Sequence, residues 1–246
     1  MKRRLLIGLA VLLLSPTLLG VAGRTPAFRA DLSAYEPYMN PGRGDEFLLL
    51  VNRTSPLADP TAPSDLTALT GTRADGRPPQ KMREYAAMAL NAMFLELRAL
   101  GYLETVSEDG HVFSVTSGYR SPAYQASLFE TYKNQYMAGG LSEAEAIRRV
   151  SKTTARPGES EHHTGLCVDM HDRTCATTAF EESPVFGWLS QNAWKFGFIL
   201  RYPKGKENVT GYSYEPWHYR FVGRFHAEQI WRDGLALEEY VKRRSG

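Results

Sequence analysis

The chain has 246 residues, of which 29 are basic and 27 acidic, and its formal net charge is +2. Three of the basic residues, Lys2, Arg3 and Arg4, precede the uncharged stretch 5–23. Without residues 1–23, the chain has 26 basic and 27 acidic residues. The rest of the chain therefore lacks the surplus of cations that nucleic-acid binding requires, which excludes a nucleic-acid partner.

Residues 1–23 have the organisation of an export signal: a basic start, an apolar run over 5–14 and small residues at 21–23. The same stretch is just long enough to cross a bilayer, although Pro16 would kink such a helix. Cleavage near Gly23 and retention as an N-terminal anchor therefore both remain open. In either case we expect an extracytoplasmic protein, secreted to the cell envelope or held at the membrane by this segment alone.

Residues 24–45 are rich in Pro, Gly and polar residues, which predicts a linker or an irregular N-terminal extension, and 46–246 are expected to form one compact domain. A short apolar run predicts a buried strand at 47–51. From Met82 to Leu100, apolar residues recur at spacings of three and four, which predicts a helix over about 80–100.

Further along the chain, short apolar runs alternate with amphipathic segments. Strands are predicted at 112–116, 165–170, 198–202 and 217–222, and helices at 122–137, 142–151, 186–195 and 225–243. Because helices and short strands are mixed without a repeated βαβ unit, the predicted fold class is α+β.

The chain has two cysteines, Cys167 and Cys175, which excludes a disulfide scaffold and a four-cysteine zinc module. Whether the two form one bridge stays open, because nothing in the sequence fixes their geometry. Cys167 lies in an apolar segment and is interpreted as an inert buried thiol, which argues against a thiol peptidase.

Three of the six histidines, His162, His163 and His171, lie close to Asp169. Such a group is typical of a catalytic zinc site, where three protein ligands leave a position open to water. His162 and Asp169 are seven residues apart and would face opposite ways in a straight strand, so we expect a bend at Thr164-Gly165. Asp169 and His171 share a strand face, so His171 is the best substitute ligand if that pairing is wrong.

A second candidate site is Glu215-Pro216-Trp217-His218, which Pro216 biases toward an extended turn. Such a loop can bring an imidazole to a metal while Glu215 accepts a proton from the attacking water. A third is Arg120, which can present a fixed cation to an oxyanion. Taken singly, these residues have simpler interpretations: a solvated acid, a turn-capping cation and, for His163, His171 and His226, structural imidazoles.

Three segments together resemble one family: Ser-Gly-Tyr-Arg-Ser at 117–121, Ser-Glu-His-His-Thr-Gly-Leu-Cys-Val-Asp at 160–169 and Glu-Pro-Trp-His-Tyr-Arg at 215–220. They are similar to the VanY-type D-alanyl-D-alanine carboxypeptidases, zinc peptidases of the LAS group, and the likeness runs from about residue 47 to 222. The resemblance implies a small, mostly antiparallel sheet flanked by helices, as in Hedgehog and D-Ala-D-Ala peptidases, with 46–246 as the catalytic domain.

The resemblance also implies the roles of the site residues. One Zn²⁺ per chain would be bound by His162, Asp169 and His218. Glu215 would be the general base, and Arg120 would steady the substrate carbonyl and oxyanion.

Less directly, the resemblance implies that Ser160 and Gln125 contact the terminal carboxylate region of the peptide. The chain departs from the family pattern at two positions: His163 stands where Gln is usual, and Cys167 stands where a small residue, often Ala, is usual. Neither change removes an expected ligand.

The function that follows is that of an exported, monomeric zinc D,D-carboxypeptidase, which removes the C-terminal D-alanine from peptidoglycan stem pentapeptides. Two alternatives keep the chemistry, an L,D-carboxypeptidase and an endopeptidase of peptidoglycan stems. A third, of a different class, is a catalytically inactive, zinc-stabilised wall-binding module. The presence of both Glu215 and Arg120 argues against the third, because a structural metal site needs neither.

Overall fold

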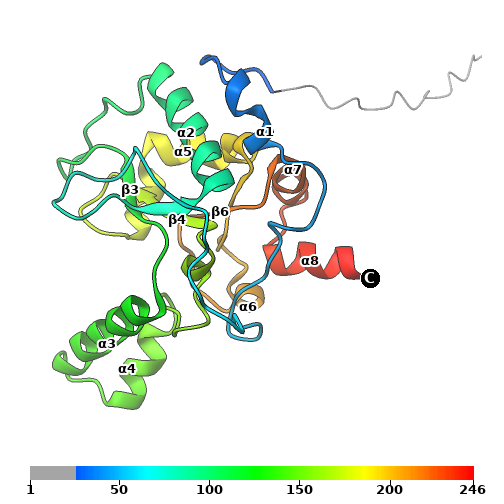
Figure 1. Ribbon diagram of the computed structural model, residues 1–246. Coiled ribbons are helices and arrows are strands. Elements are labelled where there is room, and N and C mark those ends of the chain that lie inside the picture. Colours follow the sequence, from blue (N-terminus) through cyan, green and yellow to red (C-terminus); the bar gives the residue numbers. More distant parts are fainter. Residues whose placement is uncertain (1–25) are drawn as a thin grey trace, which may run out of the picture.

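A four-stranded antiparallel sheet organises the part of the chain that the computed structural model describes, residues 26–246 (Figure 1). The predicted export signal lies outside this range. The strand order is β3 (Ser114–Ser117), β4 (Cys167–His171), β6 (His218–Phe221) and β5 (Phe198–Leu200). A separate two-stranded sheet pairs β1 (Leu66–Ala68) with β2 (Lys81–Arg83). Strands and helices are mixed without a parallel βαβ unit within the described range, so the predicted α+β class is confirmed.

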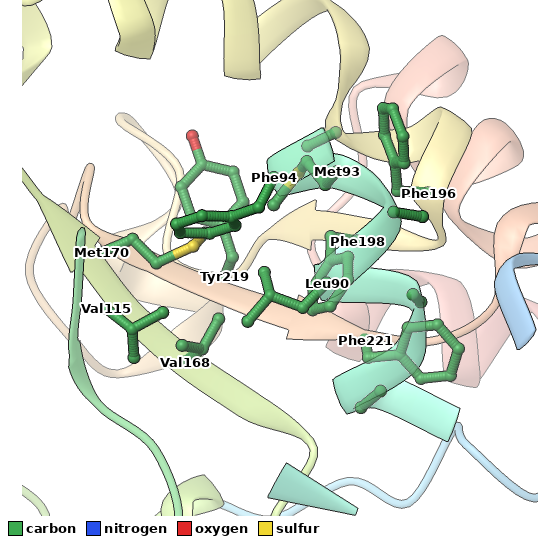
Figure 2. Close-up of a cluster of buried hydrophobic side chains, with 14 of the residues drawn as sticks. Leu90, Met93, Phe94, Val115, Val168, Met170, Phe196, Phe198, Tyr219 and Phe221 are labelled. Atoms are coloured by element: carbon green, nitrogen blue, oxygen red, sulfur yellow. The ribbon is translucent and has the colours of Figure 1, made fainter. Parts of the chain in front are cut away.

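The predicted helix over about 80–100 is present as α2 (Glu84–Ala99), and it covers one face of the sheet. Its buried face is apolar, with Leu90, Met93 and Leu97 almost fully excluded from solvent. Figure 2 shows side chains of α2 packed beside side chains of the sheet and of the segment before β5. The labelled residues of this core are Leu90, Met93, Phe94, Val115, Val168, Met170, Phe196, Phe198, Tyr219 and Phe221.

The two faces of β4 have different chemistry because side chains alternate along a strand. Val168 and Met170 belong to the apolar core under α2. Cys167, Asp169 and His171 therefore point to the opposite face, where they are also buried. This second face carries the polar residues of the candidate site.

Two helices form an arm beside the sheet. Pro122–Ala138 form α3 and Glu143–Val150 form α4, and the two pack side by side at one end of the molecule (Figure 1). The N-terminus of α4 has a complete capping box. The Ser142 hydroxyl accepts a hydrogen bond from the Glu145 backbone amide, and the Ser142 backbone amide donates to the Glu145 carboxylate. The predicted helix starting at Ser142 is thus confirmed.

The single closing helix predicted at 225–243 is wrong. The segment forms α7 (Arg224–Asp233) and α8 (Leu237–Ser245), and Gly234 separates them with a positive φ of 62°. The Gly234 and Leu235 amides donate to the carbonyls of Trp231 and Ile230, the pattern of a Schellman C-cap. The amphipathic period continues across this cap, which is why the sequence pattern did not reveal the break.

The predicted strand at 47–51 is also wrong. These residues are all described, and they contain no strand, although Phe47, Leu48 and Val51 are buried. The Phe47 and Leu49 carbonyls accept hydrogen bonds from the Arg220 guanidinium instead of from a neighbouring strand. The apolar run therefore predicted correctly that this segment is buried, but it predicted wrongly that the segment pairs in a sheet.

The segment expected to be an irregular linker carries short helices, η1 (Ser33–Tyr35) and α1 (Glu36–Met39). Leu32 and Met39 belong to the main core, and the Arg29 and Ala30 amides donate to the Glu96 carboxylate. The part of this segment from residue 26 onward therefore packs as part of the domain.

The remaining elements connect these layers. They are η2 (Glu161–Thr164), η3 (Thr178–Glu182), α5 (Pro184–Asn192), η4 (Ala193–Phe196) and α6 (Glu207–Thr210). Across residues 26–246, none of the helices combines the length and the apolar character that crossing a bilayer would need.

Candidate active site

The bend that the sequence predicts between His162 and Asp169 is present. Glu161–Thr164 form the 3-10 helix η2, and Gly165 follows it in the left-handed region with φ of 64°. The chain then enters β4 with its direction changed. This geometry lets His162, on the turn, and Asp169, on the strand, face the same space, with His162 Nε2 lying 3.3 Å from Asp169 Oδ2.

Strand pairing brings His218 to the same place. In the β4–β6 ladder, Asp169 and His218 are directly opposite each other. His218 Nδ1 lies 3.2 Å from Asp169 Oδ1, and the centroids of the His162 and His218 rings are 4.9 Å apart. The bend and the sheet register thus bring the three predicted ligands together, although His218 lies 49 positions after Asp169 and 56 after His162.

A hydrogen bond to the backbone fixes the orientation of the His162 ring. Its Nδ1 lies 2.6 Å from the Gly118 carbonyl oxygen, to which it donates as Nδ1–H. With its proton held on Nδ1, His162 has Nε2, which faces Asp169, as the nitrogen that can offer a lone pair to a metal ion. A backbone acceptor of this kind is the usual partner of a metal-ligating histidine.

His218 is backed by a buried ion-pair network that the sequence analysis missed. Glu161 Oε2 lies 3.7 Å from His218 Nε2, while Glu161 Oε1 accepts from Arg201 at 2.7 Å and from Arg220 at 2.8 Å. Glu161, Arg201 and Arg220 are 0–1% exposed. The signal in the sequence was the acid directly before His162, whose role only the fold reveals.

Glu215 lies in the turn before β6, as expected for a carboxylate that stands beside a metal. Its Oε2 is 3.5 Å from His218 Nδ1 and its side chain is buried. Burial raises the pKa of Glu215 to about 8, against the opposing charge of His218. A carboxyl group with a raised pKa is suited to accept and release a proton near neutral pH.

Arg120 is held rigidly at the edge of this group. Its Nε donates to Ser117 Oγ at 2.8 Å, and its Nη1 donates to Gln125 Oε1 at 3.3 Å. Its Nη2 lies 2.5 Å from Asp169 Oδ2. The predicted cation is therefore next to the predicted ligands and cannot swing freely.

Of the two residues expected to contact the peptide carboxylate, Ser160 lines the cavity described below and Gln125 does not. Gln125 is fully buried, accepting from Arg120 and donating to the Ala155 carbonyl at 2.8 Å. The position of Gln125 suits it to hold Arg120 in place. A substrate contact by either residue stays a prediction.

The electrostatics of the cluster favour a cation. Burial opposes ionisation of Asp169, yet the charges of His162 and Arg120 hold the pKa of this carboxyl well below its usual range. Burial also opposes protonation of His218, yet contacts with Cys167 and Asp169 raise the pKa of this imidazole well above its usual range. The site therefore stabilises positive charge, and a metal ion would take the place of the imidazolium protons.

Cys167 is a buried thiol, as the sequence predicts, but its surroundings are not those expected. It was interpreted as an inert thiol in an apolar strand, but it lies on the polar face of β4, two residues before Asp169. Burial opposes ionisation of the Cys167 thiol, while the nearby His162 and His218 lower its pKa to about 7. The period of two along the strand was the signal that could have placed it. Both cysteines, each within the described range, are free thiols, and Cys175 is exposed.

Three further histidines, His163, His171 and His226, lie outside the cluster. His163 Nδ1 faces the Arg120 carbonyl at 2.7 Å, and His171 Nδ1 lies 3.3 Å from Arg73 Nη2. His226 contacts the Tyr240 hydroxyl at 2.8 Å. Each has its own partners, so the structure does not support His171 as a substitute ligand.

The candidate ligands open onto a cavity of about 420 Å³. Its lining includes His162, Asp169, His218, Glu215 and Arg120. Further lining residues come from the α3–α4 arm and from the segment between β5 and β6, and they include Tyr132, Tyr136, Val150, Tyr202 and Trp217. A partly apolar cavity with a few convergent charged groups has the character of a small-ligand site.

Comparison with known proteins identifies relatives of the chain. A family model described as "VanY: D-alanyl-D-alanine carboxypeptidase" matches residues 80–224. The chain is 36% identical to the Bacillus subtilis protein YodJ over 216 residues, covering 85% of this chain and 70% of that protein. It is 39% identical to a D-alanyl-D-alanine carboxypeptidase of Enterococcus faecalis over 155 residues, covering 61% of this chain and 57% of that protein.

Two of the solved structures that are similar in fold are each 35% identical to the chain. One is the LD-carboxypeptidase LdcB, with a TM-score of 0.67 over 80% of this chain and 86% of that one. Another is the vancomycin-resistance D,D-pentapeptidase VanY, solved as a mutant in complex with Zn(II), with a TM-score of 0.64 over 79% of this chain and 98% of that one.

Proposed function

Because the chain belongs to the VanY family of D-alanyl-D-alanine carboxypeptidases, we propose that it is an exported enzyme that removes the C-terminal D-alanine from peptidoglycan stem pentapeptides. Its broader class is that of the family, a zinc metallopeptidase of the D-Ala-D-Ala carboxypeptidase type. The proposal depends above all on one observation: His162, Asp169, His218 and Glu215 converge in the lining of one cavity.

The donor set fits zinc. Two imidazole nitrogens and one carboxylate are a common protein ligand set for catalytic zinc, and all three residues are buried. Among residues 26–246, Asp169 Oδ1 and Glu215 Oε1 are buried side-chain oxygens without a hydrogen-bond partner. His162, Asp169 and His218 would hold the ion. When bound, zinc would supply Lewis-acid chemistry that polarises the scissile carbonyl and acidifies a water molecule.

Glu215 is the proton carrier in this proposal. Its carboxylate stands beside the ligands without being needed as one, and it opens onto the cavity. It accepts the proton of the attacking water at Oε1 or Oε2 and delivers it to the leaving amine of the terminal D-alanine.

Arg120 supplies a fixed positive charge at the cavity wall. Ser117 and Gln125 hold its guanidinium, so its charge need not reorganise as negative charge develops on the substrate carbonyl oxygen. A rigid donor of this kind stabilises the transition state more than the ground state. A catalytically inactive wall-binding module would need neither this fixed cation nor the buried Glu215 beside the ligands, which argues against that alternative.

Export to the cell envelope is part of the proposal. It is supported by the basic start and uncharged run of residues 1–23, and by the extracytoplasmic location of peptidoglycan stems. The L,D-carboxypeptidase remains the second candidate, because LdcB shares the fold at a TM-score of 0.67.

The mechanism is tested by removing the metal and the base separately. A chelator should abolish release of D-alanine from a D-Ala-D-Ala-terminated peptide, and added zinc should restore it. Glu215→Gln should bind zinc as the wild type does while the turnover number falls by at least ~10²-fold, because the proton acceptor is lost. Glu182→Gln, at an exposed position, is the matched control and should keep full activity. Turnover by Glu215→Gln at the wild-type rate would remove Glu215 from the mechanism.

A further inference from the structure

The side chain of Cys167 lies behind the candidate metal site. On β4 it shares a face with Asp169, whereas Val168 packs into the core on the other face. Cys167 is 0% exposed and does not line the cavity, although His162, Asp169 and His218 do. The thiol therefore lies on the strand side of the ligand cluster and is not exposed to the cavity.

The distances suit a shared metal ion. Donor atoms of His162, Cys167 and His218 all lie within 4.8 Å of one another, and all three residues are buried. Sulfur and nitrogen ligands of one zinc ion lie at most about 4.4 Å apart, the sum of the Zn–S and Zn–N bond lengths. A contraction of a few tenths of an ångström would bring the three donors onto one ion.

We propose that Cys167 Sγ is an additional ligand of the metal that His162, Asp169 and His218 hold, so that the ion is bound by two imidazoles, one carboxylate and one thiolate. This inference rests on the metal site of the proposed function. Because the sulfur comes from the strand side, the position facing the cavity stays available for water and substrate, in a five-coordinate arrangement that catalytic zinc accepts. A thiolate also shifts the preference of the site toward zinc, cobalt and other thiophilic ions over magnesium or calcium.

Cobalt substitution tests the proposal by spectroscopy, independently of turnover. The full chain is freed of metal and loaded with Co²⁺, whose visible d–d bands report binding and whose near-ultraviolet charge-transfer band reports a thiolate ligand. The wild type should show both. Cys167→Ser should keep the visible bands and lose the charge-transfer band, while Cys175→Ser, which removes the exposed thiol, should keep both.

Two results would overturn the inference in distinguishable ways. Visible bands without a charge-transfer band in the wild type, or a band that survives Cys167→Ser, would exclude Cys167 as a ligand and leave the proposed function intact. Failure of the wild type to bind Co²⁺ at all would overturn the metal site and this inference with it.

Zinc affinity provides a second measurement. In competition with a chromogenic chelator, Cys167→Ser and Cys167→Ala should each bind zinc at least ~10-fold more weakly than the wild type, since each removes a donor. Cys175→Ser should bind as the wild type does. Near-ultraviolet circular dichroism verifies that each variant is folded. Unchanged zinc affinity in both folded Cys167 variants would contradict the proposal.

Discussion

At the scale of single residues, Glu215 has a consequence for stability as well as for catalysis. Burial raises its pKa from 4.5 to about 8 in the metal-free protein. An acid whose folded pKa exceeds its unfolded value stabilises the fold while it is protonated. Its contribution is complete below pH 4.5 and is lost as the pH rises through 8.

We therefore expect the free energy of unfolding of the metal-free wild type to fall, relative to that of Glu215→Gln, between about pH 5 and pH 8. At about 1.4 kcal/mol per unit of pKa difference, the relative loss is on the order of 4 kcal/mol. Urea denaturation of both proteins across this range measures it. The free energy of unfolding of Glu182→Gln should change with pH as that of the wild type does. If the curves of Glu215→Gln and the wild type against pH were parallel, the pKa of Glu215 would not be raised by burial.

The sequence predicted most of the candidate site at this scale because the chemistry of its residues is local to short motifs. His162, Asp169, His218 and Glu215 do lie together, and the bend at Gly165 was required by their spacing. Cys167 is buried as expected, but its neighbours were misjudged because an apolar neighbourhood in sequence was taken for one in space. The period of two along β4 places it on the face of Asp169, and the pairing of β4 with β6 brings His218 to that face.

At the scale of elements, the turn from η2 into β4 sets the distance between His162 and Asp169. Gly165 occupies it with φ of 64°, and a Cβ there would lie 2.9 Å from Leu66 Cδ2 and 3.3 Å from the Arg83 amide nitrogen. Any side chain would thus be strained by the backbone and would also press on the β1–β2 hairpin.

Gly165→Ala should lower the free energy of unfolding by roughly 1–3 kcal/mol. It should also weaken zinc binding, because His162 moves relative to Asp169. Urea denaturation and chelator competition measure the two effects. Gly187→Ala is the matched control: Gly187 lies in α5 with open space around its Cβ position, so alanine there should be neutral or stabilise by up to about 1 kcal/mol. Equal behaviour of the two variants would contradict the role given to the turn.

Elements with strong local signals were predictable and those defined by distant contacts were not. The helices α2, α3 and α4 follow from apolar period, Pro122 and the Ser142 cap. The break at Gly234 was missed because the period continues through it. The strand at 47–51 was predicted wrongly because its carbonyls bond to Arg220, 171 or more positions away along the chain.

At the scale of the whole molecule, one buried network joins the site to the C-terminal helix. Arg201 follows β5 and donates both to Glu161, beneath His218, and to Glu238 on α8 at 2.6 Å. Arg220 adds a second cation to Glu161. Removing the charge of Glu161 would leave these buried guanidinium groups undercompensated.

Glu161→Gln should therefore lower the free energy of unfolding by roughly 3–5 kcal/mol. Glu130→Gln breaks an ion pair with Lys133 in which the carboxylate is 56% exposed, and should change stability by no more than about 0.5 kcal/mol. Urea denaturation at one pH compares the two variants. A loss for Glu161→Gln no larger than for Glu130→Gln would mean that the network does not stabilise the fold.

The central claim concerns the bond that the enzyme cleaves, and product masses test it most directly. The purified zinc-loaded protein is incubated with peptidoglycan stem pentapeptide and, separately, with stem tetrapeptide, and the products are weighed by mass spectrometry. We predict the loss of one alanine from the pentapeptide and no change in the tetrapeptide. Loss from the tetrapeptide alone would contradict the claim and identify an L,D-carboxypeptidase.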